Sequence, residues 1–295
     1  MQFPYNKKFA LTIIDDTDGA TVKNTKPVYE FLHSLGMKTT KTVWVYPSRD
    51  NFLGESLANY PYRQFIKKLQ KQGFEIALHG VGSGKFSRQE IIRGLEIYRR
   101  FIGQYPKIQI NHGQNPDNIY WGLKRFLILR LFWILEQKFQ GENPKSPYFW
   151  GDQHQKHLKF SRNLTFYDIN TLKADPHIPY REKDKKYAHY WFSASDGAEV
   201  EKLNRLISPK NIDRLQKENG ISIIYTHFAS GFVARGHLDQ TFQRNMSYLA
   251  AQDGWFATVS ELLEFLLKNG RGKQISAREK INLELKWLRD KVCGK

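Results

Sequence analysis

Short apolar runs alternate with helical segments along most of this chain of 295 residues. The runs over 11–14, 42–45, 75–78, 108–110 and 221–225 are dominated by apolar and β-branched residues, which predicts buried strands. Helical patterns lie between most of them, and this alternation predicts parallel strands joined by crossover helices. We therefore expect an α/β fold, either a doubly wound sheet or a (β/α) barrel, with functional residues at the carboxyl ends of the strands.

Three capping boxes predict where helices begin. Ser87, Thr258 and Ser276 each stand three residues before a Glu, the spacing with which a hydroxyl and a carboxylate satisfy the first backbone N–H groups. The last of these helices carries an apolar stripe: Ile281, Leu285, Leu288 and Val292. We expect the basic C-terminal segment 269–295 to pack on the body of the protein through this stripe.

The segment 141–196 is less regular than the rest of the chain and is rich in aromatic and basic residues. No internal repeat or low-complexity tract divides the sequence. We therefore expect 141–196 to be an elaborated loop region around a cleft, and not a separate domain.

The chain is strongly basic, with 46 Lys and Arg against 29 Asp and Glu and a formal net charge of +17. This charge favours a polyanionic partner such as nucleic acid, an acidic polymer or an anionic membrane surface. The sequence has no helix-turn-helix, RNP or zinc-finger signature, so no specific nucleic-acid site is predicted. The single cysteine, Cys293, excludes a disulfide framework and a cysteine zinc site within the chain.

The most apolar stretch, 126–135, is about half the length of roughly 20 residues that a spanning helix needs, and Arg130 interrupts it. A buried or half-buried helix is the favoured interpretation, and an interfacial membrane helix is the alternative. The first residues lack an apolar signal core. From the sequence we expect a cytoplasmic protein, with membrane-surface contact as an open alternative and the oligomeric state undefined.

Polar side chains follow four of the predicted strands. The pair Asp15-Asp16 follows the first strand, and His79, His112 and His227 follow three later ones. Because the carboxyl ends of parallel strands meet at one rim, these side chains are expected to share a site. Neutral imidazoles with a carboxylate suit zinc or a similar divalent metal. A second carboxylate beside the metal can accept a proton from water, and the set predicts a metal-dependent hydrolase of an amide or ester.

Four segments, taken in order, resemble the polysaccharide deacetylases of the NodB-homology group, carbohydrate esterase family four. The segment 11–16, Leu-Thr-Ile-Ile-Asp-Asp, is similar to the first motif of that family, and 76–80, Ile-Ala-Leu-His-Gly, to the second. The segment 222–227, Ser-Ile-Ile-Tyr-Thr-His, resembles the late strand that carries the acid histidine. The segment 254–263 resembles the closing part of the domain.

This resemblance implies a distorted (β/α) barrel of the glycoside hydrolase/deacetylase type over residues 1–268. The implied reaction is removal of an N- or O-acetyl group from a glycan. The positive net charge of the chain is compatible with an acidic glycan. Asp15 would be the catalytic base, Asp16 and His79 metal ligands, and His227 the general acid. The implied cofactor is a divalent metal, with zinc as the expected ion.

The chain departs from the family pattern in the second and third motifs. The family has a further metal-binding His four residues after the first one, and here Ser83 occupies that position. Where the third motif has an Arg and a Pro that orient the base, this chain has Asn111-His-Gly-Gln-Asn-Pro116. We hypothesise that His112, at the neighbouring strand end, supplies the missing ligand.

Two other functions compete with deacetylation. The segment Asp16-Thr-Asp18-Gly19 also resembles the first motif of haloacid-dehalogenase-type phosphatases, with Asp16 as nucleophile, Asp18 as acid/base and magnesium as cofactor. That function needs a later acidic motif, for which Asp152 is the nearest candidate. Alternatively, the chain is a catalytically inactive deacetylase homologue, because Ser83 stands in place of a metal-binding histidine. Such a homologue would bind glycan through aromatic residues such as Trp121.

Overall fold

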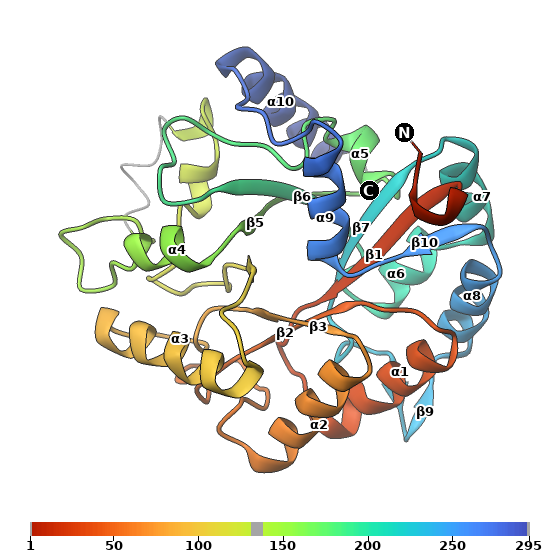
Figure 1. Cartoon of the computed structure of the whole chain (residues 1–295), viewed down its shortest axis with the longest axis horizontal. Helices are drawn as coiled ribbons and strands as arrows, with labels where there is room; N and C mark the ends of the chain where they lie inside the picture. Colours follow the sequence, from red (N-terminus) through yellow and green to blue (C-terminus); the bar gives the residue numbers. More distant parts are fainter. Residues whose placement is uncertain (1, 131–137, 294–295) are drawn as a thin grey trace.

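The computed structural model describes residues 2–130 and 138–293, and its centre is a parallel sheet closed into a ring. The strand order is β10-β1-β2-β3-β4-β5-β6-β7, and an additional parallel pairing of β1 with β7 closes the barrel. Figure 1 shows β1 beside β7 at the middle of the molecule, with α1, α2, α7 and α8 around them. The strands are β1 Phe9–Asp15, β2 Thr40–Val43, β3 Glu75–Leu78, β4 Ile108–Gln109, β5 Phe160–Phe166, β6 Tyr190–Asp196, β7 Ile221–Thr226, β8 Val233–Ala234, β9 His237–Leu238 and β10 Gly254–Phe256.

Most helices connect successive strands, as the alternation predicts. The capping boxes at Ser87, Thr258 and Ser276 are formed. The first helix begins at Val22, where Thr21 and Asn24 form a capping box without a Glu. The α-helices are α1 Val22–Ser34, α2 Tyr60–Lys71, α3 Arg88–Ile102, α4 Gly151–His157, α5 Thr171–Ala174, α6 Val200–Leu206, α7 Pro209–Lys217, α8 Gln240–Ala250, α9 Val259–Lys268 and α10 Ala277–Cys293. Short 3₁₀ turns span Pro4–Asn6 and Gly122–Arg125.

The two faces of β1 belong to two different apolar cores. In β1, Leu11 and Ile13 pack in the layer under the outer helices, whereas Ala10 and Ile14 point into the barrel. This is the alternation of period two that an extended strand imposes. Helix α9 covers the amino end of the barrel interior, where the backbone N–H of Val259 donates to Thr40 Oγ1 at 2.9 Å. The opposite, carboxyl end is therefore the one left for a site.

The segment 141–196 is not a loop elaboration, which corrects the expectation from its irregular composition. It contains α4, α5 and two full strands of the ring, β5 and β6. Polar side chains concealed the strand character of β5, since Arg162 and Asn163 are both buried in it. The segment thus completes the barrel and contributes to its interior.

The C-terminal helix α10 lies against β5, but not through the predicted stripe. Leu285 is 52% exposed and Val292 is 77% exposed. The buried face instead carries Leu283, Glu284 and Lys280. Lys280 forms an ion pair with the buried Glu182, whose other carboxylate oxygen lies 3.0 Å from Lys185 Nζ. Paired charges thus take a large part in holding α10, which apolar periodicity does not predict.

None of the described helices has the length and apolar character required to cross a membrane. Of the helix predicted over 126–135, residues 131–135 lie outside the described residues, and 126–128 are not helical.

Candidate active site and metal centre

A pocket of about 720 Å³ opens at the carboxyl end of the barrel. Four of the five site residues predicted from the sequence line it, namely Asp16, His79, His112 and His227. Asp18, two residues beyond Asp16, lines it as well. The structure therefore brings the strand ends together as the topology predicts.

The inward-facing alternation of each strand explains why these side chains meet. Asp16 has the parity of Ala10 and Ile14, which point into the barrel. On β7, His227 has the parity of the interior residues Ile221 and Ile223. In the same way His79 follows Ala77 by two residues, and His112 follows Ile110 by two. Each functional side chain thus continues the interior row of its own strand.

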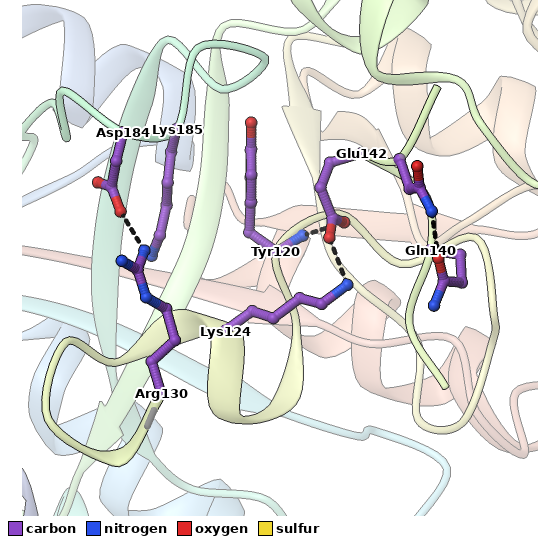
Figure 2. A pocket seen from close by; sticks show the side chains of 8 residues that line it. Tyr120, Lys124, Arg130, Gln140, Glu142, Asp184 and Lys185 are labelled. Atoms are coloured by element: carbon purple, nitrogen blue, oxygen red, sulfur yellow. Dashed lines mark hydrogen bonds and ion pairs between the residues drawn. The ribbon is translucent and has the colours of Figure 1, made fainter. Parts of the chain in front are cut away.

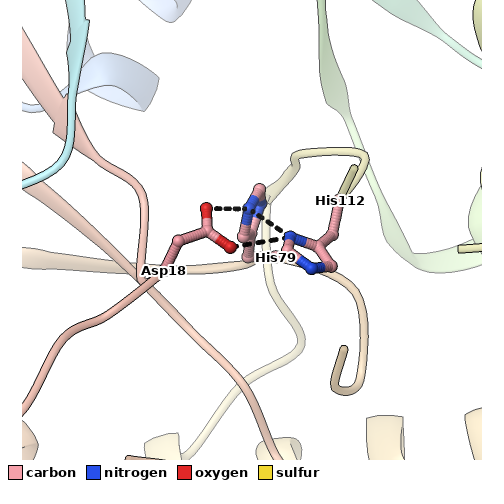
Figure 3. Close-up of side chains that lie close together, drawn as sticks. All are labelled: Asp18, His79 and His112. Carbon is pink, nitrogen blue, oxygen red and sulfur yellow. Dashed lines mark hydrogen bonds and ion pairs between the residues drawn. The ribbon is translucent and has the colours of Figure 1, made fainter. Parts of the chain in front are cut away.

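Three imidazoles surround the carboxylate of Asp18 (Figure 3 shows two of them). His112 Nδ1 lies 2.9 Å from Asp18 Oδ1, and His79 Nε2 lies 3.1 Å from Oδ2. His227 Nε2 approaches the same Oδ2 at 3.2 Å. The two imidazole nitrogens of His79 and His112 lie 3.2 Å from each other.

This arrangement fits a divalent metal ion. Ligand atoms on a tetrahedral zinc ion with bonds of about 2.0–2.1 Å lie about 3.3 Å apart. The separations of 2.9, 3.1 and 3.2 Å among Asp18, His79 and His112 come close to that spacing. Asp18 Oδ1 is buried and accepts no hydrogen bond from the described residues, so a cation would satisfy it. Two imidazoles and a carboxylate are also a donor set that zinc accepts.

The charges around Asp18 and His227 favour their ionised forms. Burial raises the pKa of the Asp18 carboxyl, but the charge of His79 and the contacts with His112 and His227 lower it further, so its pKa lies well below the usual range. For His227, burial lowers the pKa, but Asp18 and Asp16 outweigh that effect and raise it. The His227 Nδ1 lies 3.1 Å from the Ala198 carbonyl oxygen and donates to it, which leaves Nε2 facing the pocket.

Asp16 is paired with a residue that the sequence analysis did not single out, Arg162 of β5. The Arg162 nitrogens donate to both carboxylate oxygens, at 3.1 and 2.5 Å, and both side chains are almost fully buried. Burial raises the pKa of Asp16, but the charge of Arg162 outweighs it and holds the pKa below its usual value. The guanidinium also lies 4.4 Å from the centre of the Tyr225 ring, which fixes its position.

Asp15, the expected catalytic base, does not line this pocket. It is the last residue of β1 and has the outward parity of Leu11 and Ile13. Its carboxylate lies 2.8 Å from Lys41 Nζ, and both side chains are fully buried. Tyr29 Oη and the backbone N–H of Phe228 also donate to it, at 2.9 and 2.8 Å. Asp15 is therefore an internal ion-pair residue behind the site.

Ser83 does not leave a gap where the family has its second histidine. Its hydroxyl lies 2.7 Å from His112 Nε2 and 2.6 Å from Asp50 Oδ1. Ser83 is fully buried, and so is His112. The serine thus contacts the imidazole that arrives from the next strand, on the side opposite Asp18.

Three residues of the pocket are not predicted from the sequence as parts of a metal-dependent site. Asp18 is predicted only as the acid/base of a phosphatase, although the spacing Asp16-x-Asp18 before Gly19 is a visible signal. Arg162 had no signal, because its strand was not predicted. Trp287 of α10 lines the pocket, and the prediction of the wrong buried stripe hid it.

The phosphatase alternative gains no support from the structure. Asp152, its candidate for the later acidic motif, lies on α4 and pairs with Arg88 at 2.6 and 2.7 Å. Asp152 does not line the pocket that contains Asp16 and Asp18. The three histidines around Asp18 have no role in that alternative.

A second cavity, of about 610 Å³, is lined by a different set of residues (Figure 2). Lys124 Nζ lies 2.6 Å from the Glu142 carboxylate, and Arg130 donates to Asp184 at 2.7 Å. Since these charges pair with one another, the cavity offers no comparable group of convergent ligands among the described residues.

The barrel matches solved structures of polysaccharide deacetylases. A protein described as a polysaccharide deacetylase from Mycobacterium smegmatis superposes with a TM-score of 0.54 at 13% identity, over 94% of this chain and 96% of the other. One from Pseudomonas aeruginosa PAO1 gives a TM-score of 0.52 at 11% identity, over 90% and 93%. No family model and no curated protein matches the chain. The distorted (β/α) barrel expected from the sequence resemblance is confirmed.

Proposed function

We propose that this barrel, which has the fold of the polysaccharide deacetylases, is a metal-dependent hydrolase that removes an acetyl group from a glycan. The observation that carries the proposal is the convergence of Asp16, Asp18, His79, His112 and His227 in one pocket. The geometry of this chain favours Asp18 as the metal ligand and Asp16 as the base, whereas the resemblance implied Asp16 as a ligand and Asp15 as the base.

Asp18, His79 and His112 would hold the metal ion, with zinc as the expected ion. A divalent cation held there would supply Lewis-acid polarisation of the scissile acyl carbonyl. This assignment replaces Asp16 by Asp18 as the carboxylate ligand. Asp18 lies within 3.2 Å of all three imidazoles, whereas both oxygens of Asp16 already accept from Arg162.

Asp16 is the proposed general base. It offers a carboxylate oxygen within 4.8 Å of ligand atoms of Asp18 and His227, so a water molecule between them can reach it. Its low pKa keeps it ionised at neutral pH, as a proton acceptor requires. Arg162 holds the carboxylate in one orientation, and each oxygen keeps a lone pair for the proton of the attacking water.

His227 is the proposed general acid. Its Nδ1–H is occupied by the Ala198 carbonyl, so the proton that it can transfer is on Nε2, which faces the pocket. Its raised pKa favours the protonated form that a leaving amine or alkoxide needs. The Asp18 contact at 3.2 Å fixes the ring toward the metal side of the pocket.

A glycan would lie against the aromatic part of the pocket lining. Trp121, Arg125 and Trp287 all line the pocket. The Arg125 guanidinium lies 4.3 Å from the centre of the Trp121 ring, and Trp287 packs on Phe126 at 4.9 Å between ring centres. Partly exposed, immobilised aromatic rings can stack on the apolar faces of sugar rings. Arg125 and the net charge of +17 favour an acidic glycan.

Acetate release tests the proposal directly. The purified protein, stripped with a chelator and reloaded with Zn²⁺ or Co²⁺, is incubated with N-acetylglucosamine oligomers and with O-acetylated xylan. We expect metal-dependent release that Asp16→Asn lowers by about 10²–10⁴-fold. Asp213→Asn, an exposed aspartate of α7, is the matched control and should release acetate like the wild type. Glycan binding without release from any substrate would instead identify an inactive homologue.

A further inference from the structure

The chain Asp50–Ser83–His112 links the surface to the proposed metal centre through two short hydrogen bonds. Ser83 Oγ lies 2.6 Å from Asp50 Oδ1 and 2.7 Å from His112 Nε2. On the other side of the ring, His112 Nδ1 faces Asp18 and His79 at 2.9 and 3.2 Å. The two nitrogens of His112 thus face different surroundings.

The hydrogen-bonding capacity of Asp50 and Ser83 determines the protonation of His112 Nε2. A serine hydroxyl has a single proton to donate. Asp50 is ionised at neutral pH, because burial raises its pKa but the hydrogen bonds from Ser83 and from the Phe52 backbone N–H lower it further. An ionised carboxylate only accepts, so the hydroxyl proton of Ser83 lies toward Asp50. Ser83 Oγ must then accept from His112, whose proton is on Nε2.

We infer that Asp50 and Ser83 are positioning residues that fix the Nε2–H tautomer of His112 and so present its Nδ1 lone pair to the metal ion. Ser83 therefore replaces a ligating histidine by orienting one from the neighbouring strand. The inference deepens the proposed metal centre and rests on it. Orienting partners of this kind commonly change metal affinity by 10–100-fold when they are removed.

Substitutions of Ser83 and of Asp50 are expected to affect the proton of the His112 ring differently. Ser83→Ala removes the acceptor for Nε2–H and leaves the tautomer unspecified. Asp50→Asn can donate its amide N–H to Ser83 Oγ, which frees the serine proton to point at His112 Nε2. That change favours the Nδ1–H tautomer, which cannot ligate. Asp50 is exposed, so this variant tests the inference without disturbing the core.

Zinc affinity, measured by competition with a chromophoric chelator, is the first readout. We expect Ser83→Ala and Asp50→Asn each to raise the Kd for Zn²⁺ by 10–100-fold. Ser48→Ala is the matched control, since Ser48 also donates to Asp50 Oδ1, at 3.0 Å, but does not contact Ser83 or His112. It should bind zinc like the wild type. A Kd within twofold of the wild type for both test variants would overturn the inference.

The second readout needs neither metal nor activity. Nitrogen-15 chemical shifts of His112 in the metal-free protein, recorded well above the ordinary histidine pKa of about 6.5, distinguish the two neutral tautomers. We expect protonated Nε2 in the wild type and a shift toward protonated Nδ1 in Asp50→Asn. Protonated Nδ1 together with unprotonated Nε2 in the wild type would contradict the inference. A wild-type protein that binds zinc normally but releases no acetate would count against the proposed reaction alone.

Discussion

Asp16 and Arg162 face each other inside the barrel mouth although 146 residues separate them in the sequence. Two nitrogens of one guanidinium reach the two oxygens of one carboxylate, at 3.1 and 2.5 Å. Such a two-point contact fixes the plane of the carboxylate as well as its position. The proposed base is thus oriented by a strand that lies across the barrel.

The first prediction concerns this two-point contact. Arg162→Lys keeps the charge but loses the planar fork, so Asp16 should turn more freely and kcat for acetate release should fall by about tenfold or more. Arg88→Lys is the matched control, because Arg88 makes an equivalent contact with Asp152 outside the pocket. Steady-state kinetics of both variants provide the comparison. Equal losses of kcat would show that the orientation of Asp16 is irrelevant.

A second prediction separates the two pocket aspartates. Asp18→Asn removes a proposed ligand and should weaken zinc binding by about 100-fold or more, whereas Asp16→Asn should change it by less than tenfold. Titration of the metal-free proteins with Zn²⁺ in a calorimeter measures both. If Asp16→Asn lost as much affinity as Asp18→Asn, Asp16 would be a ligand, as the sequence resemblance implied.

A third prediction concerns Asp15, whose buried ion pair gives it a structural role. Asp15→Asn leaves the charge of Lys41 buried without its partner, which should lower the free energy of unfolding by about 3–5 kcal/mol. Asp253→Asn breaks a partly exposed pair with Lys7 and should cost about 0–1 kcal/mol. Urea denaturation of the metal-free proteins gives both values. A stable Asp15→Asn protein that lost only activity would restore Asp15 as the base.

The fourth prediction tests the aromatic wall of the pocket. Trp287→Ala should raise KM for a glycan by about tenfold with a smaller change in kcat, because stacking on an aromatic ring stabilises the bound substrate and its transition state alike. Leu285→Ala, on the same helix but 52% exposed and outside the pocket, is the control. An unchanged KM in Trp287→Ala would place the sugar elsewhere.

The fifth prediction is a pH dependence of stability that arises from His154. Burial lowers the pKa of this imidazole to about 4, and Nδ1 donates to the Tyr187 carbonyl at 2.7 Å. Between pH 6.5 and about 4 the unfolded chain binds the proton and the folded protein does not, so stability falls as the pH falls through that range. The shift corresponds to about 3 kcal/mol.

His154→Gln removes this titration and provides the comparison. Its free energy of unfolding should be lower than that of the wild type at pH 7, with a difference that shrinks toward pH 4. Urea denaturation at several pH values measures the difference, which also cancels the contribution of the carboxylates common to both proteins. A difference that did not change with pH would show that His154 has the same pKa in the folded protein as in the unfolded chain.

Most strands of the barrel can be predicted from local sequence. The faces of β1 on which Asp15 and Asp16 lie cannot. β1 is apolar on both faces, so nothing in its sequence indicates that Asp16 continues the interior row and that Asp15 faces the helices. That distinction depends on Lys41, which lies on the neighbouring strand. The histidines were predictable because each follows a recognisable strand.

The residues that sequence analysis missed are those whose burial depends on a distant partner. Arg162 sits in a strand because Asp16 neutralises it, and a buried Arg in an isolated pattern looks like surface. In the same way, α10 buries Lys280 and Glu284 through Glu182 and through the backbone N–H groups of Leu127 and Ile128. A prediction based on the spacing of apolar residues ignores buried charged residues, so it indicates the wrong face of α10.

The pairing of β1 with β7, which closes the ring, has a kinetic consequence. The backbone N–H of Asp16 donates to the Thr226 carbonyl at 2.8 Å, and His227 is the next residue. The two halves of the proposed site therefore come into contact only when the first and seventh strands join, a contact between distant segments that forms slowly in folding. In a partly folded chain with an open ring, Asp16 and Asp18 are separated from His227, so the proposed base and the proposed acid do not face each other. Closure of the ring is therefore required for proton transfer, whereas the proposed ligands Asp18, His79 and His112 follow strands of the unbroken part of the sheet.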